Sequence, residues 1–144
     1  MFEMDKRLLE DTVALGDFSL SRVLLMNDSR YPWLILVPRI ADASEVFELT
    51  VEQQQQFWQE TNTVGQVLKA VFQADKINIA TLGNVVKQLH MHIVVRMQED
   101  AVWPAPVWGK GTAQPYTVEQ LTQIQMRLQN ALADDWQTEQ KVVS

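Results

Sequence analysis

The sequence contains no cysteine, and its 144 residues include only two histidines and two tyrosines. Without cysteine the chain cannot form a disulfide bond and offers no thiolate for catalysis or metal binding. This absence fits a reducing compartment. Because only two imidazoles are available, any chemistry that depends on histidine must use His90 or His92.

Long apolar runs are also missing. No stretch approaches the ~20 apolar residues that a membrane-spanning helix requires. The first residues include Glu3 and Asp5 and lack the apolar block of a secretory signal. With 47% hydrophobic and 21% charged residues, the composition is that of a globular protein. We therefore expect residues 1–144 to form a single soluble, cytoplasmic domain that binds no membrane.

Basic residues are fewer than acidic ones. Twelve Lys and Arg stand against eighteen Asp and Glu, for a net charge of −6. Neutralisation of phosphates dominates affinity for long nucleic acids, so the excess of acid argues against such a partner. One small nucleotide remains compatible, because a pocket needs only local donors. Four basic residues lie near the motifs described below, and each is individually expected to be a solvated surface charge: Arg39, Lys87, Arg96 and Lys110.

The first third of the sequence predicts a short helix followed by strands. Turn-forming residues separate β-branched and apolar stretches, which is typical of antiparallel strands joined by tight turns. We expect the last two strands to pair as an antiparallel hairpin. In chain order the predicted elements are a helix at 4–11, an extended piece at 12–15, a turn at Gly16–Asp17, and strands at 18–26 and 33–37.

Two helices are predicted from apolar residues at three- and four-residue spacing. The longer helix covers 51–73 and begins with a capping box, in which Thr50 and Gln53 bond to each other's backbone amides. The second helix covers 117–137, begins with the same motif on Thr117 and carries Trp136 on its buried stripe. A further strand at 76–82 follows the long helix and leads into a turn.

The stretch Gln88-Leu89-His90-Met91-His92 contains both histidines and opens an apolar run that ends at Arg96. Its alternation and the β-branched residues behind it predict a strand. Successive side chains on a strand point to opposite faces, so Gln88, His90 and His92 share one face. That face is the candidate active site, while Leu89 and Met91 point into the core.

Two other interpretations of the histidines are open. A histidine in an apolar strand is often a hydrogen-bonded core residue without chemistry. His-x-His can also supply two metal ligands, but zinc or iron requires three or four, and no third histidine or cysteine is present. Carboxylates would have to complete the shell, and the nearest, Glu99 and Asp100, follow only after the strand.

Residues 84–96, Asn-Val-Val-Lys-Gln-Leu-His-Met-His-Ile-Val-Val-Arg, resemble the His-x-His-x-His signature of the histidine triad (HIT) family. Residues 33–39, Trp-Leu-Ile-Leu-Val-Pro-Arg, resemble that family's strand ending in Val-Pro-Lys/Arg. The resemblance covers roughly 19–109, with Gln88 at the first triad position. It implies an α+β fold: an antiparallel sheet of about five strands, a long helix between the central strands, a C-terminal helix, and a homodimer.

The resemblance also implies a nucleotide site. Asn27, and less strongly Asp28, match the position that holds ribose hydroxyls. Asn78 and Asn84 match positions where amides contact phosphates or orient the site, and Gly83 lies in the same turn. The loop of tryptophans, prolines and glycines at 103–111 resembles segments that border the nucleotide in this family.

The activity implied is hydrolysis or transfer of a nucleotide at its α-phosphate, without a cofactor or metal. His90 would form a nucleotidyl-histidine intermediate and His92 would contact the phosphate. Gln88 can hydrogen-bond but cannot carry a proton near neutral pH. Dinucleoside polyphosphates are the favoured substrates, followed by nucleoside phosphoramidates. The alternative is a nucleotide-binding module with weak or vestigial catalysis.

Overall fold

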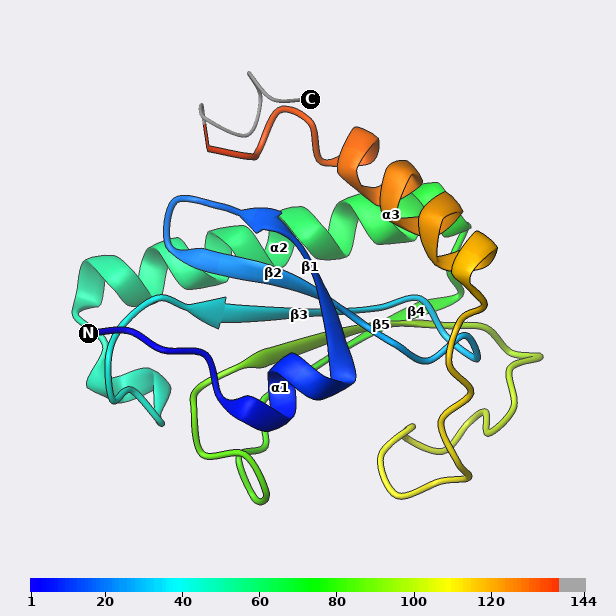
Figure 1. Ribbon diagram of the computed structural model, residues 1–144, viewed down its shortest axis with the longest axis horizontal. Helices are drawn as coiled ribbons and strands as arrows, with labels where there is room; N and C mark the ends of the chain where they lie inside the picture. The colour runs from blue at the N-terminus through cyan, green and yellow to red at the C-terminus, as the bar shows by residue number, and fades with distance from the viewer. Residues whose placement is uncertain (138–144) are drawn as a thin grey trace.

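The computed structural model describes residues 1–137 and contains one five-stranded antiparallel sheet in the order β1-β2-β3-β5-β4 (Figure 1). This confirms the predicted α+β fold with a long helix between the central strands. The elements are α1 (Lys6–Asp11), β1 (Thr12–Asp17), β2 (Ser21–Met26), β3 (Trp33–Pro38), a 3₁₀ turn (Val46–Glu48), α2 (Val51–Phe72), β4 (Lys76–Ala80), β5 (Met91–Arg96) and α3 (Val118–Ala131).

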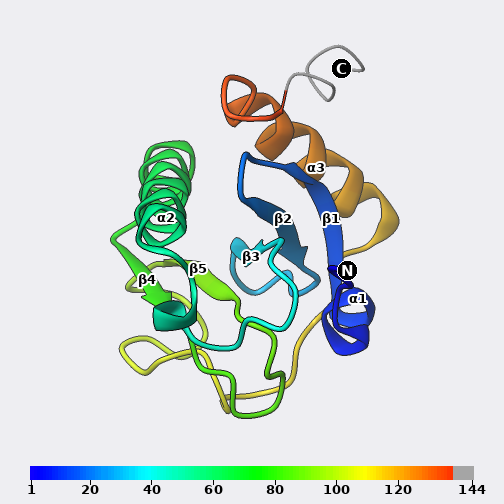
Figure 2. The ribbon, with the colours of Figure 1, turned by 90° about the vertical axis from the view of Figure 1, so that its left-hand side faces the viewer.

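Helices α2 and α3 cover one face of the sheet. Helix α1 and the segment after β5 cover the other (Figure 2). On the first face, Phe57 of α2, Leu128 of α3 and Ile93 of β5 are fully buried in one apolar cluster. On the second face, Leu8 of α1 and Val107 pack with apolar residues of the strands. The central strands β2, β3 and β5 therefore send alternate side chains into two separate apolar clusters, whereas β1 and β4 contribute only to the first.

The hairpin of β2 and β3 confirms the predicted pairing, with Leu24 opposite Ile35. The turn predicted at Gly16–Asp17 is wrong, because both residues belong to β1, which pairs with β2. A bulge between Ala14 and Gly16 shifts the register there and lets β1 continue to Asp17. The chain reverses instead at 18–20.

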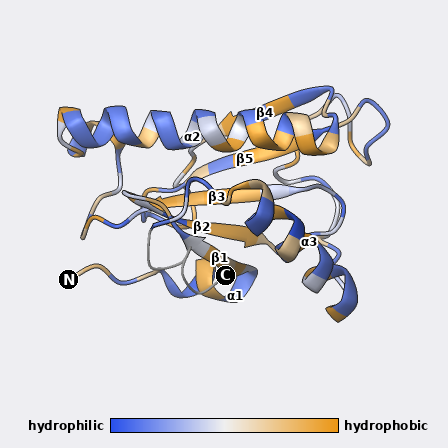
Figure 3. Ribbon diagram, turned by 90° about the horizontal axis from the view of Figure 1, so that it is seen from above, coloured by the Kyte–Doolittle hydropathy of each residue, from blue (hydrophilic) through white to orange (hydrophobic). Residues whose placement is uncertain are grey.

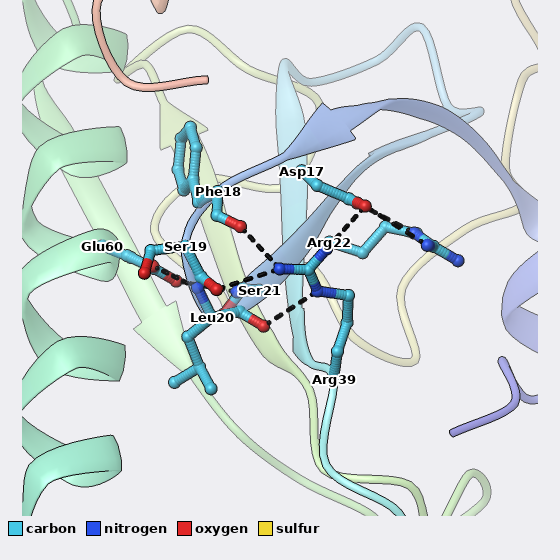
Figure 4. Close-up of polar contacts among 8 residues, drawn as sticks. All are labelled: Asp17, Phe18, Ser19, Leu20, Ser21, Arg22, Arg39 and Glu60. Atoms are coloured by element: carbon cyan, nitrogen blue, oxygen red, sulfur yellow. Dashed lines mark hydrogen bonds and ion pairs between the residues drawn. The ribbon is translucent and has the colours of Figure 1, made fainter. Parts of the chain in front are cut away.

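Two long polar side chains hold that reversal (Figure 4). Glu60 of α2 is 5% exposed and accepts hydrogen bonds from the backbone amides of Leu20 at 2.9 Å and Ser21 at 3.0 Å. Arg39 pairs with Asp17 at 2.7 Å. Its guanidinium also donates to three backbone carbonyls of the turn, those of Phe18, Ser19 and Leu20. Arg39 is therefore a structural residue, and its prediction as a solvated surface charge is wrong.

Helix α2 begins with the predicted capping box, in which Thr50 accepts from the amide of Gln53 and the Gln53 side chain accepts from that of Thr50. Its first half is mostly hydrophilic and its second half largely hydrophobic (Figure 3). The helix ends at Phe72, one residue before the predicted end, because Gln73 adopts a left-handed conformation with φ of 51°.

Helix α3 also begins with the predicted capping box, on Thr117, but it ends at Ala131 and does not reach residue 137. Asp134 and Asp135 follow, and acidic side chains are unfavourable at the negative end of a helix dipole. Trp136, predicted on the buried stripe of this helix, is buried all the same. It lies beyond the helix, with its ring 5.0 Å from that of Phe18.

No helix among residues 1–137 combines the length and the apolar character needed to cross a membrane. The prediction of one domain extends to residue 144, beyond the described residues, and stays a prediction.

Candidate active site

The two histidines lie against each other at the start of β5, with ring centroids 4.8 Å apart and planes at 73°. The strand begins at Met91, so the predicted start was too early, and Gln88 and His90 belong to the preceding loop. Alternation within β5 places Met91 in the helix-covered cluster and His92 on the opposite face. Both imidazoles are nearly buried, with His90 5% and His92 6% exposed.

Trp33 of β3 fixes the protonation of His92. Its indole nitrogen Nε1 donates a hydrogen bond to Nδ1 of His92 at 3.0 Å. Because an indole N–H can only donate, Nδ1 must be the unprotonated nitrogen. The neutral ring of His92 therefore carries its proton on Nε2. Strand pairing explains the contact, since His92 is opposite Ile35 and Trp33 is the diagonal neighbour on the same face.

The pKa of His92 is lowered to about 3 by burial and, secondarily, by the charge of His90. Protonation of Nδ1 would also bring two N–H groups of His92 and Trp33 face to face. His92 is therefore neutral near pH 7, and it can offer a hydrogen-bond donor but not a positive charge.

This shift predicts a stability change with pH. In the unfolded chain His92 protonates near its ordinary pKa of ~6.5, whereas in the folded protein it stays neutral down to about pH 3. Between these values the unfolded state binds more protons, so stability decreases as pH falls, by up to ~1.4 kcal/mol per pH unit. Urea unfolding between pH 7 and pH 4.5 should show this decline, and His92→Asn should flatten it. An equally steep decline in the variant would contradict the assignment.

His90 has the opposite tautomer. Its Nδ1 lies 2.6 Å from the backbone carbonyl oxygen of Gln88. A carbonyl can only accept, so Nδ1 of the neutral ring carries the proton and Nε2 keeps its lone pair. His90 thus offers an unprotonated nitrogen, while its neighbour His92 offers an N–H. This is the chemical asymmetry that a nucleophile and an anion-binding donor require.

The side chain of Gln88 bonds to the N-terminal segment. Its amide oxygen accepts from the backbone N–H of Asp5 at 2.7 Å, and its amide nitrogen donates to the carbonyl of Glu3 at 2.8 Å. The residue at the first triad position therefore reaches His90 through its main chain. A direct role of the Gln88 side chain toward substrate stays a prediction.

Trp108 covers the other side of His92, with ring centroids 5.3 Å apart. It also packs edge-on against Trp33, at 5.9 Å between centroids. The two tryptophans thus hold the His92 ring between β3 and the loop that follows β5.

Arg96 anchors this loop and is 1% exposed, so its prediction as a surface charge is wrong. Its guanidinium makes two hydrogen bonds to Asp100, at 2.9 and 3.1 Å, and one to the carbonyl of Ala105 at 2.8 Å. It also lies over the rings of Tyr31 and Trp103. Burial would raise the pKa of Asp100, but hydrogen bonds from Arg96 and from two backbone amides together lower it.

A cavity of about 400 Å³ is lined in part by Trp33 and Trp108, the two tryptophans that contact His92, although neither histidine lines it. Asn27 and Asp28 line it as well, so the structure brings these two predicted residues close to the site. The Oδ1 atom of Asn27 accepts from the backbone amide of Tyr116 at 2.9 Å. Lys110 also lines the cavity and is exposed, as predicted.

Asp28 is 1% exposed and paired with Arg30 at 2.8 Å. Burial alone would raise the pKa of Asp28. The net shift is downward, because Asp28 accepts hydrogen bonds from the Arg30 side chain and from the amides of Arg30 and Gln114, and because Arg30 is positively charged. Its carboxylate therefore holds the cavity wall together. Ribose contacts by Asn27 and Asp28 stay predictions.

The three remaining predicted residues do not line the cavity. Asn78 of β4 accepts from Arg96 at 2.9 Å, so its amide oxygen supports the loop after β5. Gly83, with φ of 83°, and the exposed Asn84 lie on the loop that joins β4 to β5. Nucleotide contacts by these residues stay predictions. Within residues 1–137, no three His, Asp or Glu side chains are grouped to hold a metal ion.

Sequence reasoning did not identify Trp33 or Arg30 as parts of the site. Trp108 was indicated as part of the loop at 103–111, which resembles segments that border the nucleotide, and it does line the cavity. The available signal was the strand alternation that places Trp33 and Ile35 on one face. That signal was insufficient without the register between β3 and β5, which brings Trp33 to His92.

Comparison with known proteins places the chain in a family. The HIT domain matches residues 8–99. A histidine triad protein from Marinobacter aquaeolei VT8 is 46% identical, with a TM-score of 0.92 over 94% of this chain and 98% of that one. A histidine triad protein from Sinorhizobium meliloti 1021 is also 46% identical, with a TM-score of 0.89 over 92% and 98% of the two chains. The protein therefore belongs to the histidine triad family.

More distant structures share the fold. The diadenosine triphosphate hydrolase of Plasmodium falciparum, solved with cyclomarin A, is 16% identical, with a TM-score of 0.65 over 95% of this chain and 84% of that one. No curated protein matched the sequence.

Proposed function

We propose that the protein hydrolyses or transfers nucleotides at the α-phosphate, through a covalent intermediate on His90. The observation that carries the proposal is the pair of opposite tautomers, with an unprotonated Nε2 on His90 and an N–H at Nε2 of His92. Membership of the histidine triad family and the fold shared with a diadenosine triphosphate hydrolase support a nucleotide substrate.

In the proposed reaction Nε2 of His90 attacks the α-phosphorus. A P–N bond forms as the bond to the leaving group breaks, and the leaving group departs with the bonding electrons. The N–H of His92 donates to a non-bridging oxygen, where it stabilises the developing charge. Water then attacks the phosphorus and loses a proton to solvent, the electrons of the P–N bond return to Nε2, and His90 regains its original tautomer as the nucleoside monophosphate is released.

The leaving group separates the two substrate classes. A nucleoside polyphosphate is a weak base and leaves without a proton, whereas an amine needs one. Neither Gln88 nor the neutral, low-pKa His92 supplies a proton easily. The site therefore favours dinucleoside polyphosphates over nucleoside phosphoramidates.

A substrate panel tests this proposal against a nucleotide-binding module without catalysis. Diadenosine tri- and tetraphosphate and an adenosine phosphoramidate should be assayed with and without a chelator. We expect turnover of the polyphosphates, unaffected by chelation. Binding of adenosine monophosphate without turnover of any substrate would favour the binding module, and activity lost on chelation would contradict the metal-free mechanism.

We also propose a homodimer that uses the outer side of α2. Three large apolar residues are exposed at or just before its first turns: Phe47 (78%), Val51 (69%) and Trp58 (47%). Specific interfaces usually bury more than ~1,000 Å² and are rich in such residues. Sedimentation should give twice the monomer mass, and Trp58→Lys should shift it toward the monomer. Val118→Lys on α3 is the matched control, and a stable wild-type monomer at micromolar concentration would contradict the dimer.

A further inference from the structure

Gln88 connects two parts of the chain that are more than 80 positions apart. Both halves of its side-chain amide are used by the backbone of the N-terminal segment, at Asp5 and Glu3, with separations of 83 and 85 residues. The bonds are short, at 2.7 and 2.8 Å. An amide is suited to this contact because it presents a donor and an acceptor side by side.

The main chain of Gln88 is fixed on its other side. Its carbonyl accepts a hydrogen bond from Nδ1–H of His90, and the next amide, that of Leu89, donates to the carbonyl of Ala43 at 2.9 Å. Leu89 itself is 3% exposed and anchored in the core. Rotation of the Gln88 carbonyl is therefore restricted both by the following residue and by its own side chain.

The N-terminal segment is a firm anchor for this side chain. Phe2 and Met4 pack against the apolar cluster that contains Leu8 and Trp33. Asp5 is the N-cap of α1, where its side chain accepts from the amide of Arg7. The segment thus lies on the same face of the sheet as the histidine pair and is held there independently of Gln88.

We infer that Gln88 is a positioning residue that couples the N-terminal segment to the tautomer of His90. This inference depends on the proposed role of His90 as nucleophile. The side-chain amide holds the loop before β5, so that the backbone carbonyl stays within hydrogen-bond distance of Nδ1. When the carbonyl moves away, His90 also populates the tautomer that carries its proton on Nε2. In that tautomer the attacking nitrogen has no free lone pair.

The test uses the fact that both histidines of the chain lie in the site. Labelling with ¹⁵N-histidine gives signals from His90 and His92 alone, and ring nitrogen shifts report each tautomer. In the unaltered protein we expect a proton on Nδ1 of His90 and on Nε2 of His92. In Gln88→Met, which keeps the length but loses both bonds, the His90 signals should move toward a mixture of tautomers while those of His92 stay unchanged.

Kinetics and amide exchange complete the test. In Gln88→Met, kcat should fall roughly 10- to 100-fold, the loss typical when partners that orient metal-bound histidines are removed, with KM nearly unchanged. The amide of Asp5 should exchange faster. Gln88→Asn is the second variant, to be used if Gln88→Met does not fold. It retains the amide but is too short to reach both backbone groups, so it should show the same tautomer change, the same loss of kcat and the same faster exchange at Asp5. The exposed neighbour change Lys87→Met is the control.

An unchanged His90 tautomer in Gln88→Met or Gln88→Asn, with the Asp5 bond lost, would overturn the inference. The spectra do not depend on turnover. A tautomer change in a protein that forms no covalent adduct would therefore contradict the nucleophile proposal and leave the positioning of His90 established.

Discussion

His90→Asn should abolish turnover while the protein stays folded. The substitution removes the nitrogen whose lone pair attacks the phosphorus in the proposed reaction, so we expect kcat to fall by ~10³-fold or more, as when a covalent nucleophile is removed from other enzymes. Asparagine is smaller and polar, and nucleotide binding should persist because His92 and the cavity wall remain. The measurement is kcat with a diadenosine polyphosphate, beside the dissociation constant of adenosine monophosphate.

His92→Asn is the matched variant, because it alters the neighbouring imidazole, which is similarly buried. It should lose about 10²- to 10³-fold in kcat, as expected for one donor to the developing charge. Rapid-quench mass spectrometry of the unaltered protein should find a nucleotidyl adduct on His90. Near-normal turnover of His90→Asn, or an adduct on another residue, would refute the mechanism.

Arg96→Met should cause the largest loss of stability. It removes the cation from a buried pair and leaves the Asp100 carboxylate, which is 6% exposed, without its partner. The Asn78 oxygen and the Ala105 carbonyl also lose their donor. Breaking one side of a buried pair typically costs about 3–5 kcal/mol. Urea unfolding at pH 7 should show a loss of this size.

Two controls define the origin of that loss. Arg96→Met combined with Asp100→Leu removes both charges and should recover part of the stability, because no unpaired charge stays buried. Arg127→Met removes an exposed arginine and should change the free energy of unfolding by less than ~1 kcal/mol. A loss for Arg96→Met no larger than that for Arg127→Met would contradict the anchoring role.

Local patterns were sufficient for most of the fold. Alternation and helical spacing predicted the hairpin of β2 and β3, the long helix with its capping box on Thr50, and the start of α3 at Thr117. These features depend on residues a few positions apart, which the sequence shows directly. The reversal at 18–20 was missed because its partners, Glu60 and Arg39, are 19 to 40 positions away.

The candidate site was predictable in part. The spacing of His90 and His92 placed both imidazoles together, and Asn27 does line the adjoining cavity. The sequence also suggested that the Arg96 side chain was solvated, because the residues next to it in the sequence do not indicate that it is buried. Its burial arises from Tyr31, Asn78 and the loop after β5, which converge only in the folded chain.

The residue types that could do chemistry follow from composition alone, because the chain has two histidines and no cysteine. The protonation of those histidines was decided by tertiary structure. The register of β3 against β5 brings the Trp33 donor to His92, and the loop before β5 brings the Gln88 carbonyl to His90. A tautomer depends on which donor or acceptor faces each ring nitrogen, and for His92 that partner is 59 positions away.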